Sequence, residues 1–154
     1  NQCTVLVYGR DKSGEYSILH HAFVCGPGRT TPIGTFRTPF KAAWHPLQGC
    51  WGQYCTQITG NYLFHSSPYN SPNKNDLSYR LYNQLGTVCS HGCVRLTVAD
   101  AKWIYDNCPL GTTVSIYNAS SLPVPKPSAP WLDISSPNRG WDPTDPDPAN
   151  PWNK

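Results

Sequence analysis

The distribution of prolines divides this chain into two parts. Nine of the sixteen prolines lie in residues 119–154, together with three of the six tryptophans. Proline lacks a backbone N–H and has a fixed φ, so this density is incompatible with central strands and helix interiors. We therefore predict one globular domain over residues 1–118, followed by an extended Pro-rich C-terminal tail over residues 119–154. At least one of Trp131 and Trp141 is expected to pack on the domain, because exposed tryptophan is costly.

Short segments rich in apolar residues dominate the first 118 residues. Residues 3–8 and 16–25 flank a polar turn that contains two glycines, which predicts a β-hairpin. Glycine and proline interrupt the chain over residues 26–34. Further strands are expected at residues 62–65 and 112–117. The fold class is therefore mainly β.

Two short helices are expected in the second half of the domain. Asp76 can cap the first helix, which Gly86 ends. Thr97 can cap the second helix, with Asp100 in the capping-box position, and Pro109 ends it. The predicted architecture is a β-sheet or sandwich with these helices as additions.

The overall charge and apolar pattern exclude some classes of function. The formal net charge is only +3 and no run of lysine or arginine occurs, which argues against nucleic-acid binding. No apolar run approaches the roughly 18 residues of a transmembrane helix. The chain opens directly on a strand-like run, so we expect any export signal or upstream domain to have been removed.

The seven cysteines are many for this length, and their number is odd. Three disulfides plus one free thiol is the natural partition in an oxidising compartment. We predict one bond across the hairpin, one across a short turn and one between a loop and the end of the second helix, with Cys93 free: Cys3–Cys25, Cys50–Cys55 and Cys89–Cys108. The domain is thus expected to be stapled by disulfides.

Cys93, the predicted free thiol, lies in the segment with the most candidate catalytic residues, Cys89-Ser-His-Gly-Cys-Val-Arg-Leu96. A nucleophilic cysteine needs a base or a positive environment to form its thiolate. His91 is only two residues from Cys93 and cannot easily point at it in a regular extended chain. His65 ends an apolar strand and is the better base. Gly92 lets the backbone approach a substrate, which suits N–H donors aimed at an oxyanion.

The motif Ser90-His91-Gly92-Cys93, with the upstream His65, resembles the core motif of the L,D-transpeptidases (YkuD-like). Thr31-Pro-Ile-Gly-Thr-Phe36 is similar to a loop of the same family. The resemblance covers most of residues 3–118 and implies a YkuD-like β-sandwich. It departs from the family in the twenty-four residues between His65 and Ser90, which are several more than usual and are expected to form a lid or cap.

The resemblance also implies a reaction and a place in the cell. The cysteine thiolate attacks an amide of a peptidoglycan stem tetrapeptide, expels the terminal D-alanine and passes the acyl group to the amine of a second stem, forming a cross-link. No cofactor or metal is implied, carbapenems are implied as acylating inhibitors, and the location is extracytoplasmic in a bacterium. The roles carried over are nucleophile for Cys93, base for His65, orientation of His65 for Ser66, shaping of the site for Ser90 and His91, oxyanion donors for the backbone of Gly92 and Cys93, and a substrate carboxylate contact or a surface charge for Arg95.

Three alternatives remain open from the sequence. An L,D-carboxypeptidase would use the same residues with water in place of the acceptor amine. A noncatalytic cell-wall-binding module would keep the fold without the chemistry. A zinc site would use Cys89, His91, Cys93 and His65 as ligands, although this close spacing is unusual for structural zinc.

Overall fold

The computed structural model describes residues 1–154 and is mainly β with a few short helices, as predicted. The elements, in chain order, are β1 (Thr4–Arg10), β2 (Tyr16–Val24), β3 (Gly34–Arg37), β4 (Lys41–Pro46), β5 (Trp51–Thr59), β6 (Tyr62–Ser66), α1 (Tyr79–Tyr82), β7 (Val94–Leu96), α2 (Val98–Asn107), β8 (Thr113–Ile116) and the 3₁₀ turn η1 (Pro151–Asn153). No helix has the length and apolar character that crossing a membrane requires.

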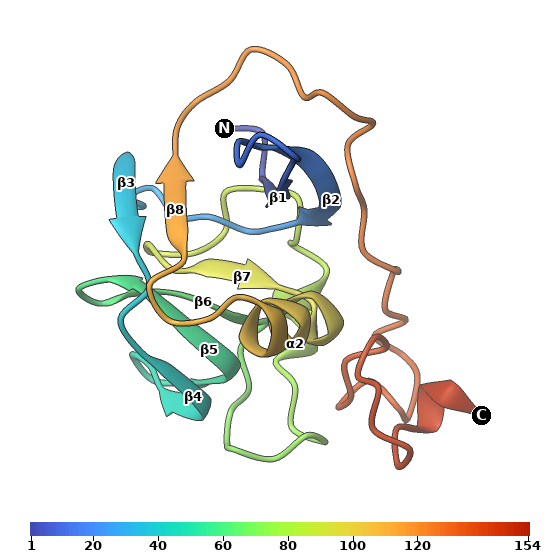
Figure 1. Ribbon diagram of the computed structural model, residues 1–154. Coiled ribbons are helices and arrows are strands. Elements are labelled where there is room, and N and C mark those ends of the chain that lie inside the picture. Colours follow the sequence, from blue (N-terminus) through green and yellow to red (C-terminus); the bar gives the residue numbers. More distant parts are fainter.

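The strands form one larger sheet and two hairpin-sized ones. The larger sheet has the order β4-β5-β6-β7, and its last pair, β6 and β7, is parallel. β1 pairs with β2 and β3 pairs with β8, both antiparallel. Gly26, just after β2, forms an isolated bridge with Arg95 of β7, so the first hairpin is joined to the edge of the larger sheet. Figure 1 shows α2 lying across β6 and β7.

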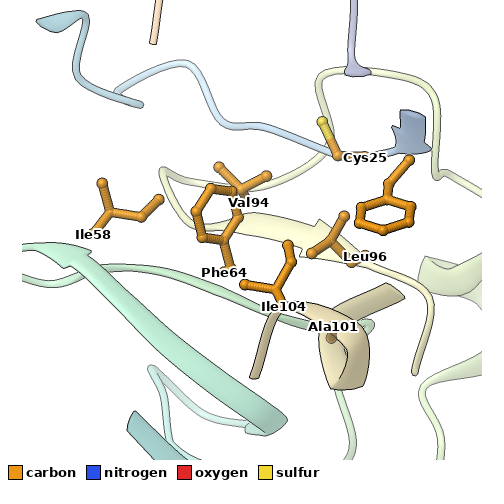
Figure 2. Packing of buried hydrophobic residues seen from close by; sticks show 8 residues of the cluster. Cys25, Ile58, Phe64, Val94, Leu96, Ala101 and Ile104 are labelled. Atoms are coloured by element: carbon orange, nitrogen blue, oxygen red, sulfur yellow. The ribbon is translucent and has the colours of Figure 1, made fainter. Parts of the chain in front are cut away.

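Alternation along β6 and β7 separates a core face from a second face. Phe64, Val94 and Leu96 are buried in the main hydrophobic cluster, where they meet Ala101 and Ile104 of α2 (Figure 2). Successive side chains of a strand point to opposite faces. His65, Cys93 and Arg95 therefore lie on the face that turns away from this cluster.

The two predicted helices have different outcomes. α2 begins where predicted, and the Thr97 hydroxyl accepts a hydrogen bond of 3.2 Å from the backbone N–H of Asp100. The first predicted helix shrinks to the four residues of α1. Its expected cap, Asp76, instead accepts a hydrogen bond from Ser71, and the N–H of Leu77 donates to Gly140. The C-terminal segment therefore competes for the backbone groups that a longer helix would have used.

The predicted disulfide framework is not present, which corrects the disulfide-stapled fold: all seven cysteines are free thiols. Cys50 and Cys55 were expected to flank a turn, but Trp51–Thr59 is strand β5. Five residues of extended chain span about 16 Å, far beyond the roughly 7 Å that a disulfide bridges.

The other two predicted pairs differ in their geometry. Cys3 and Cys25 do lie side by side across the hairpin, where the N–H of Cys25 donates to the carbonyl of Cys3 at 2.9 Å, but their thiols are unbridged. Cys89 lies against Gly26 at the end of the hairpin, whereas Cys108 closes the far end of α2. The predicted Cys89–Cys108 disulfide, between the loop and the end of the second helix, was therefore wrong.

Residues 119–154 contain no strand and no helix beyond η1, and they run over the surface to end beside α2 (Figure 1). Leu132 is fully buried in a second hydrophobic cluster with Tyr69 and Tyr82, and Trp152 packs against it. Of the two tryptophans expected to pack on the domain, Trp131 is 78% exposed and Trp141 is half-buried, and the fully buried side chain in this stretch is Leu132.

Candidate active site

Parallel pairing of β6 and β7 brings the two principal residues of the predicted site together. In this register Phe64 is opposite Val94 and His65 is opposite Arg95, so Cys93 lies just before the paired segment. All three polar side chains, His65, Cys93 and Arg95, line one cleft of about 510 Å³. A histidine and a cysteine 28 residues apart in sequence are thus delivered to the same place by the sheet.

The tautomer of His65 follows from its hydrogen bond. His65 is 1% exposed, and its Nδ1 lies 2.5 Å from the backbone oxygen of Ser66. A carbonyl oxygen can only accept, so Nδ1 carries the proton and Nε2 keeps a free lone pair. Burial lowers the pKa of His65 to about 4. The imidazole is therefore neutral at physiological pH and able to accept a proton at Nε2.

Ser66 supports His65 through its backbone rather than its hydroxyl. The carbonyl of Ser66 binds Nδ1 of His65, while its Oγ accepts from the N–H of Gln53 at 3.0 Å and donates to the carbonyl of Ser67 at 2.9 Å. These side-chain bonds tie β6 to β5. The Ser66 carbonyl therefore contacts the imidazole, and the Ser66 hydroxyl fixes the strand that carries both residues.

Cys93 is held as a thiol in the resting structure. Its Sγ lies 3.5 Å from the backbone oxygen of Asn61, which can only accept a hydrogen bond. Burial raises the pKa of Cys93, and a backbone hydrogen bond from Leu63 and the positive charge of Arg95 oppose this shift without reversing it. The sequence reasoning expected a thiolate near neutral pH. The geometry instead places a neutral thiol in the same cleft as a neutral imidazole, an arrangement that suits general-base activation.

The remaining motif residues build the loop before β7. His91 is exposed in the cleft, and Ser90 donates its hydroxyl to the carbonyl of Cys93. Gly92 is buried, and a Cβ there would lie 2.4 Å from Cε1 of Tyr62 and 2.7 Å from Oγ1 of Thr30. The glycine is therefore required by contacts within the protein, whereas the sequence reasoning assigned it to the approach of a substrate.

Arg95 has one structural bond and free donors. Its Nη1 donates to the carbonyl of Cys89 at 2.8 Å, which closes the loop that carries the motif. A guanidinium has five N–H donors. The side chain lines the cleft, so it can hold this loop and also face an anionic group.

Several cleft residues were missed by the sequence reasoning. Thr30 and Asn61 come from loops, and Tyr62 is the first residue of β6. His45 and Cys50 come from β4 and the loop that follows it. None has a sequence pattern that marks it, because each reaches the cleft through pairings of the larger sheet or through loop contacts.

The zinc alternative lacks geometric support. No group of three or more histidine, cysteine, aspartate or glutamate side chains is placed to bind a metal ion. Cys89, His91, Cys93 and His65 do not converge on one point. Cys89 lies against Gly26 instead, on the side of the hairpin.

Comparison with known proteins assigns the family. Residues 2–116 match the family model described as YkuD, L,D-transpeptidase catalytic domain. The protein YciB of Bacillus subtilis (strain 168), whose name assigns it provisionally to the L,D-transpeptidases, is 39% identical over 93 residues, which is 56% of this chain and 46% of YciB.

Solved structures share the fold. A Clostridium acetobutylicum ATCC 824 protein described as a fused Zn-dependent amidase/peptidase/peptidoglycan-binding domain-containing protein superposes with a TM-score of 0.56 at 34% identity, covering 75% of this chain and 48% of that one. L,D-transpeptidase 3 from Mycobacterium tuberculosis gives a TM-score of 0.54 at 20% identity, covering 76% and 58%. This chain spans about half the length of the first two relatives, 46% and 48%. It belongs to the YkuD family of L,D-transpeptidase catalytic domains.

Proposed function

We propose that this chain is a cysteine-dependent L,D-transpeptidase that acts on peptidoglycan stem tetrapeptides and forms an acyl-enzyme through Cys93. The observation that carries the proposal is the parallel β6–β7 register, which places the neutral imidazole of His65 and the thiol of Cys93 on one face and in one cleft. Family membership supports transpeptidase chemistry in general. The substrate and the residue roles are the proposal.

The acylation half of the reaction uses four groups of the site. Nε2 of His65 takes the thiol proton of Cys93 as the sulfur attacks the carbonyl carbon of the L,D amide. The backbone N–H groups of Gly92 and Cys93 stabilise the negative charge that develops on the carbonyl oxygen. The tetrahedral intermediate then collapses to a thioester. His65 returns the proton to the departing nitrogen, so D-alanine leaves as a neutral amine.

Deacylation repeats these steps in reverse order. The amine of a second stem peptide attacks the thioester carbonyl and gives a proton to Nε2 of His65. The sulfur of Cys93 leaves and recovers that proton, which regenerates the thiol and completes the cross-link. If water replaces the amine, the same residues release a tripeptide, which is the carboxypeptidase reaction. Such a substrate places the enzyme outside the cytoplasm, at the bacterial cell wall.

Two solved relatives suggest a chemical probe. L,D-transpeptidase 3 from Mycobacterium tuberculosis has been solved with a faropenem-derived adduct, and LdtMt1 has been solved with imipenem. Both β-lactams carry a strained amide that a nucleophile can open. Because the cleft here holds the thiol of Cys93 and the neutral imidazole of His65, we expect a carbapenem to acylate Cys93.

The test combines mass and product analysis. The protein is incubated with imipenem and measured by intact mass, with Cys93→Ala as the control, and the modified peptide is mapped. In parallel, the protein is incubated with a disaccharide-tetrapeptide, and the products are separated by chromatography. A cross-linked dimer supports the proposal, a trimmed tripeptide assigns a carboxypeptidase, and neither adduct nor product indicates a noncatalytic wall-binding module.

A further inference from the structure

We propose that Thr30 and Thr31 are positioning residues that orient the oxyanion-binding N–H groups of Gly92 and Cys93. Neither threonine belongs to the motif that carries the nucleophile, and both lie about sixty residues before it in the sequence. The inference rests on the proposed function, because it concerns the same acylation step.

Three consecutive carbonyls of the loop before β7 each accept a hydrogen bond from a side-chain hydroxyl. Thr30 Oγ1 donates to the carbonyl of His91 at 2.6 Å, and Thr31 Oγ1 donates to the carbonyl of Gly92 at 2.7 Å. Ser90 Oγ donates to the carbonyl of Cys93. The backbone N–H of Thr30 adds a second bond to the carbonyl of His91, at 3.2 Å. Three successive peptide planes are thus held by hydrogen bonds to their carbonyl oxygens.

Fixing a carbonyl also fixes an N–H, because the peptide group is planar and trans. The carbonyl of His91 and the N–H of Gly92 belong to one plane, with opposite directions. The carbonyl of Gly92 and the N–H of Cys93 belong to the next plane. Since both carbonyls point at the threonines, both N–H groups point away from them. Neither N–H donates to an acceptor within the protein, and Gly92 and Cys93 line the cleft.

The hydroxyl of Thr31 has only one orientation available. The backbone N–H of Gly28 donates to Thr31 Oγ1 at 2.8 Å, which occupies a lone pair of that oxygen. The single hydroxyl proton then goes to the carbonyl of Gly92. The threonine thus connects its own loop to the active-site loop as both acceptor and donor, and this leaves the Gly92–Cys93 peptide little freedom to rotate.

A close backbone contact brings the two loops together. A Cβ on Gly28 would lie 2.2 Å from N of Gly92, 2.4 Å from C of His91 and 2.5 Å from Cα of Gly92. These three atoms share one peptide plane, so Gly28 stacks on the face of that plane and leaves its in-plane N–H unobstructed. Only glycine permits this approach, and it sets the short distance across which the threonines reach.

Acylation and alkylation of Cys93 differ in whether they need the oriented N–H groups. Acylation passes through a tetrahedral intermediate and needs the oriented N–H groups. Alkylation by iodoacetamide is a direct displacement at carbon, which forms no oxyanion and needs only the thiol and its base. Losing one oxyanion donor costs about 10²–10³-fold in rate, so loosening its orientation is expected to cost about 10-fold or more. A positioning residue should therefore affect acylation and spare alkylation.

The experiment compares Thr31→Val and Thr31→Ser with the parent protein, with Thr30→Val as a second test. Valine keeps the shape of threonine without the hydroxyl, whereas serine keeps the hydroxyl. Acylation by imipenem and by 4-nitrophenyl acetate is followed by intact mass, with Cys93→Ala as background. Alkylation of Cys93 by iodoacetamide is followed by peptide mapping.

We expect Thr31→Val to slow acylation by both reagents at least about 10-fold while alkylation stays within about twofold, and Thr31→Ser to restore acylation. The inference is overturned if Thr31→Val is acylated at the parent rate, or if acylation and alkylation fall together, as they would after collapse of the loop. A parent protein that reacts with 4-nitrophenyl acetate but not with imipenem counts against the proposed substrate class. In that case, the acylation of Thr31→Val by the ester still tests the role of Thr31.

Discussion

The carboxylate of Asp142 accepts a hydrogen bond of 2.9 Å from the backbone N–H of Val98, the first residue of α2. The next N–H, that of Ala99, donates to Oγ1 of Thr144 at 3.1 Å, and Thr97 binds the third. The first N–H groups of a helix have no partners within it. Two of the three are satisfied here by the C-terminal segment, which thereby completes the helix that packs on the main core.

We predict that Asp142→Ala lowers the free energy of unfolding by about 1–2 kcal/mol, the usual cost of losing a helix cap. Asp142 is fully buried, so the substitution also leaves the N–H of Val98 without a partner. Urea denaturation followed by circular dichroism measures the change. Asp133→Ala is the matched control, because this exposed carboxylate of the same segment bonds only to Ser135. Equal midpoints for the two variants would show that the cap contributes nothing.

The burial of His65 predicts a loss of stability in acid. Its pKa is lowered from the ordinary value of 6.5 to about 4. Between these values the unfolded chain binds a proton that the folded protein does not, so stability falls as the pH drops from 6.5 to 4. The loss reaches about 3 kcal/mol at the lower end of this window. Unfolding free energies are measured across pH 4–8 for the parent and for His65→Gln.

In the difference between these two proteins, the contributions of other titrating groups cancel. The difference should be constant above pH 6.5 and should change steadily below it. Parallel curves throughout would mean that His65 titrates normally in the folded state, in which case it is not buried as described.

Local patterns predicted the elements whose partners are close in sequence. The Thr97–Asp100 cap lies within one helical turn and was predicted correctly. His65 and the Cys93 segment are distant in sequence, and their proximity was expected from the family resemblance and not from a local pattern. The long first helix failed, because the N–H of Leu77 bonds to Gly140, 63 residues later. A helix signal read from a short window cannot account for such a partner.

The missed parts of the site have the same cause. Thr31 reaches the carbonyl of Gly92 across 61 residues, and nothing in the sequence around either residue marks the contact. The Cys50–Cys55 disulfide was predicted across a short turn, but the residues after Cys50 form strand β5, which contains Cys55. Spacing rules describe turns, and they fail where a segment is extended.

Replacement of Gly92 by alanine should displace the active-site loop. The added methyl would lie 2.4 Å from Cε1 of Tyr62, well inside van der Waals contact. We expect acylation to fall at least about 10-fold, since the full loss of one oxyanion donor costs about 10²–10³-fold and the displaced loop misorients these donors. The double variant Gly92→Ala/Tyr62→Ala, compared with Tyr62→Ala alone, should show a smaller loss, because the clash with Tyr62 is removed and only the contact of 2.7 Å with Oγ1 of Thr30 remains. A Gly92→Ala enzyme as active as the parent would contradict the proposed packing.

The pH dependence of alkylation should report a protonated thiol. Burial raises the pKa of Cys93 above its ordinary value of 9.0. The rate of iodoacetamide labelling at Cys93 should therefore keep rising above pH 9, since only the thiolate reacts directly. The measurement uses peptide mapping at a series of pH values. A plateau reached by pH 7 would instead indicate a thiolate–imidazolium pair and a depressed pKa.

The two histidines of the cleft should differ in their effect on acylation. Cys93→Ala abolishes the reaction, and His65→Ala should slow it by about 10²–10⁴-fold, the usual contribution of a general base. His65 is buried, carries its proton on Nδ1 and comes from β6, which the sheet holds beside the nucleophile. The residue His91 is exposed, and Thr30 binds its backbone carbonyl, not its imidazole. His91→Ala keeps that carbonyl, so we expect a much smaller effect. Single-turnover acylation by imipenem, measured by intact mass, distinguishes the two variants. If His65→Ala is acylated at the parent rate and His91→Ala is slow, the roles of the two histidines have to be exchanged.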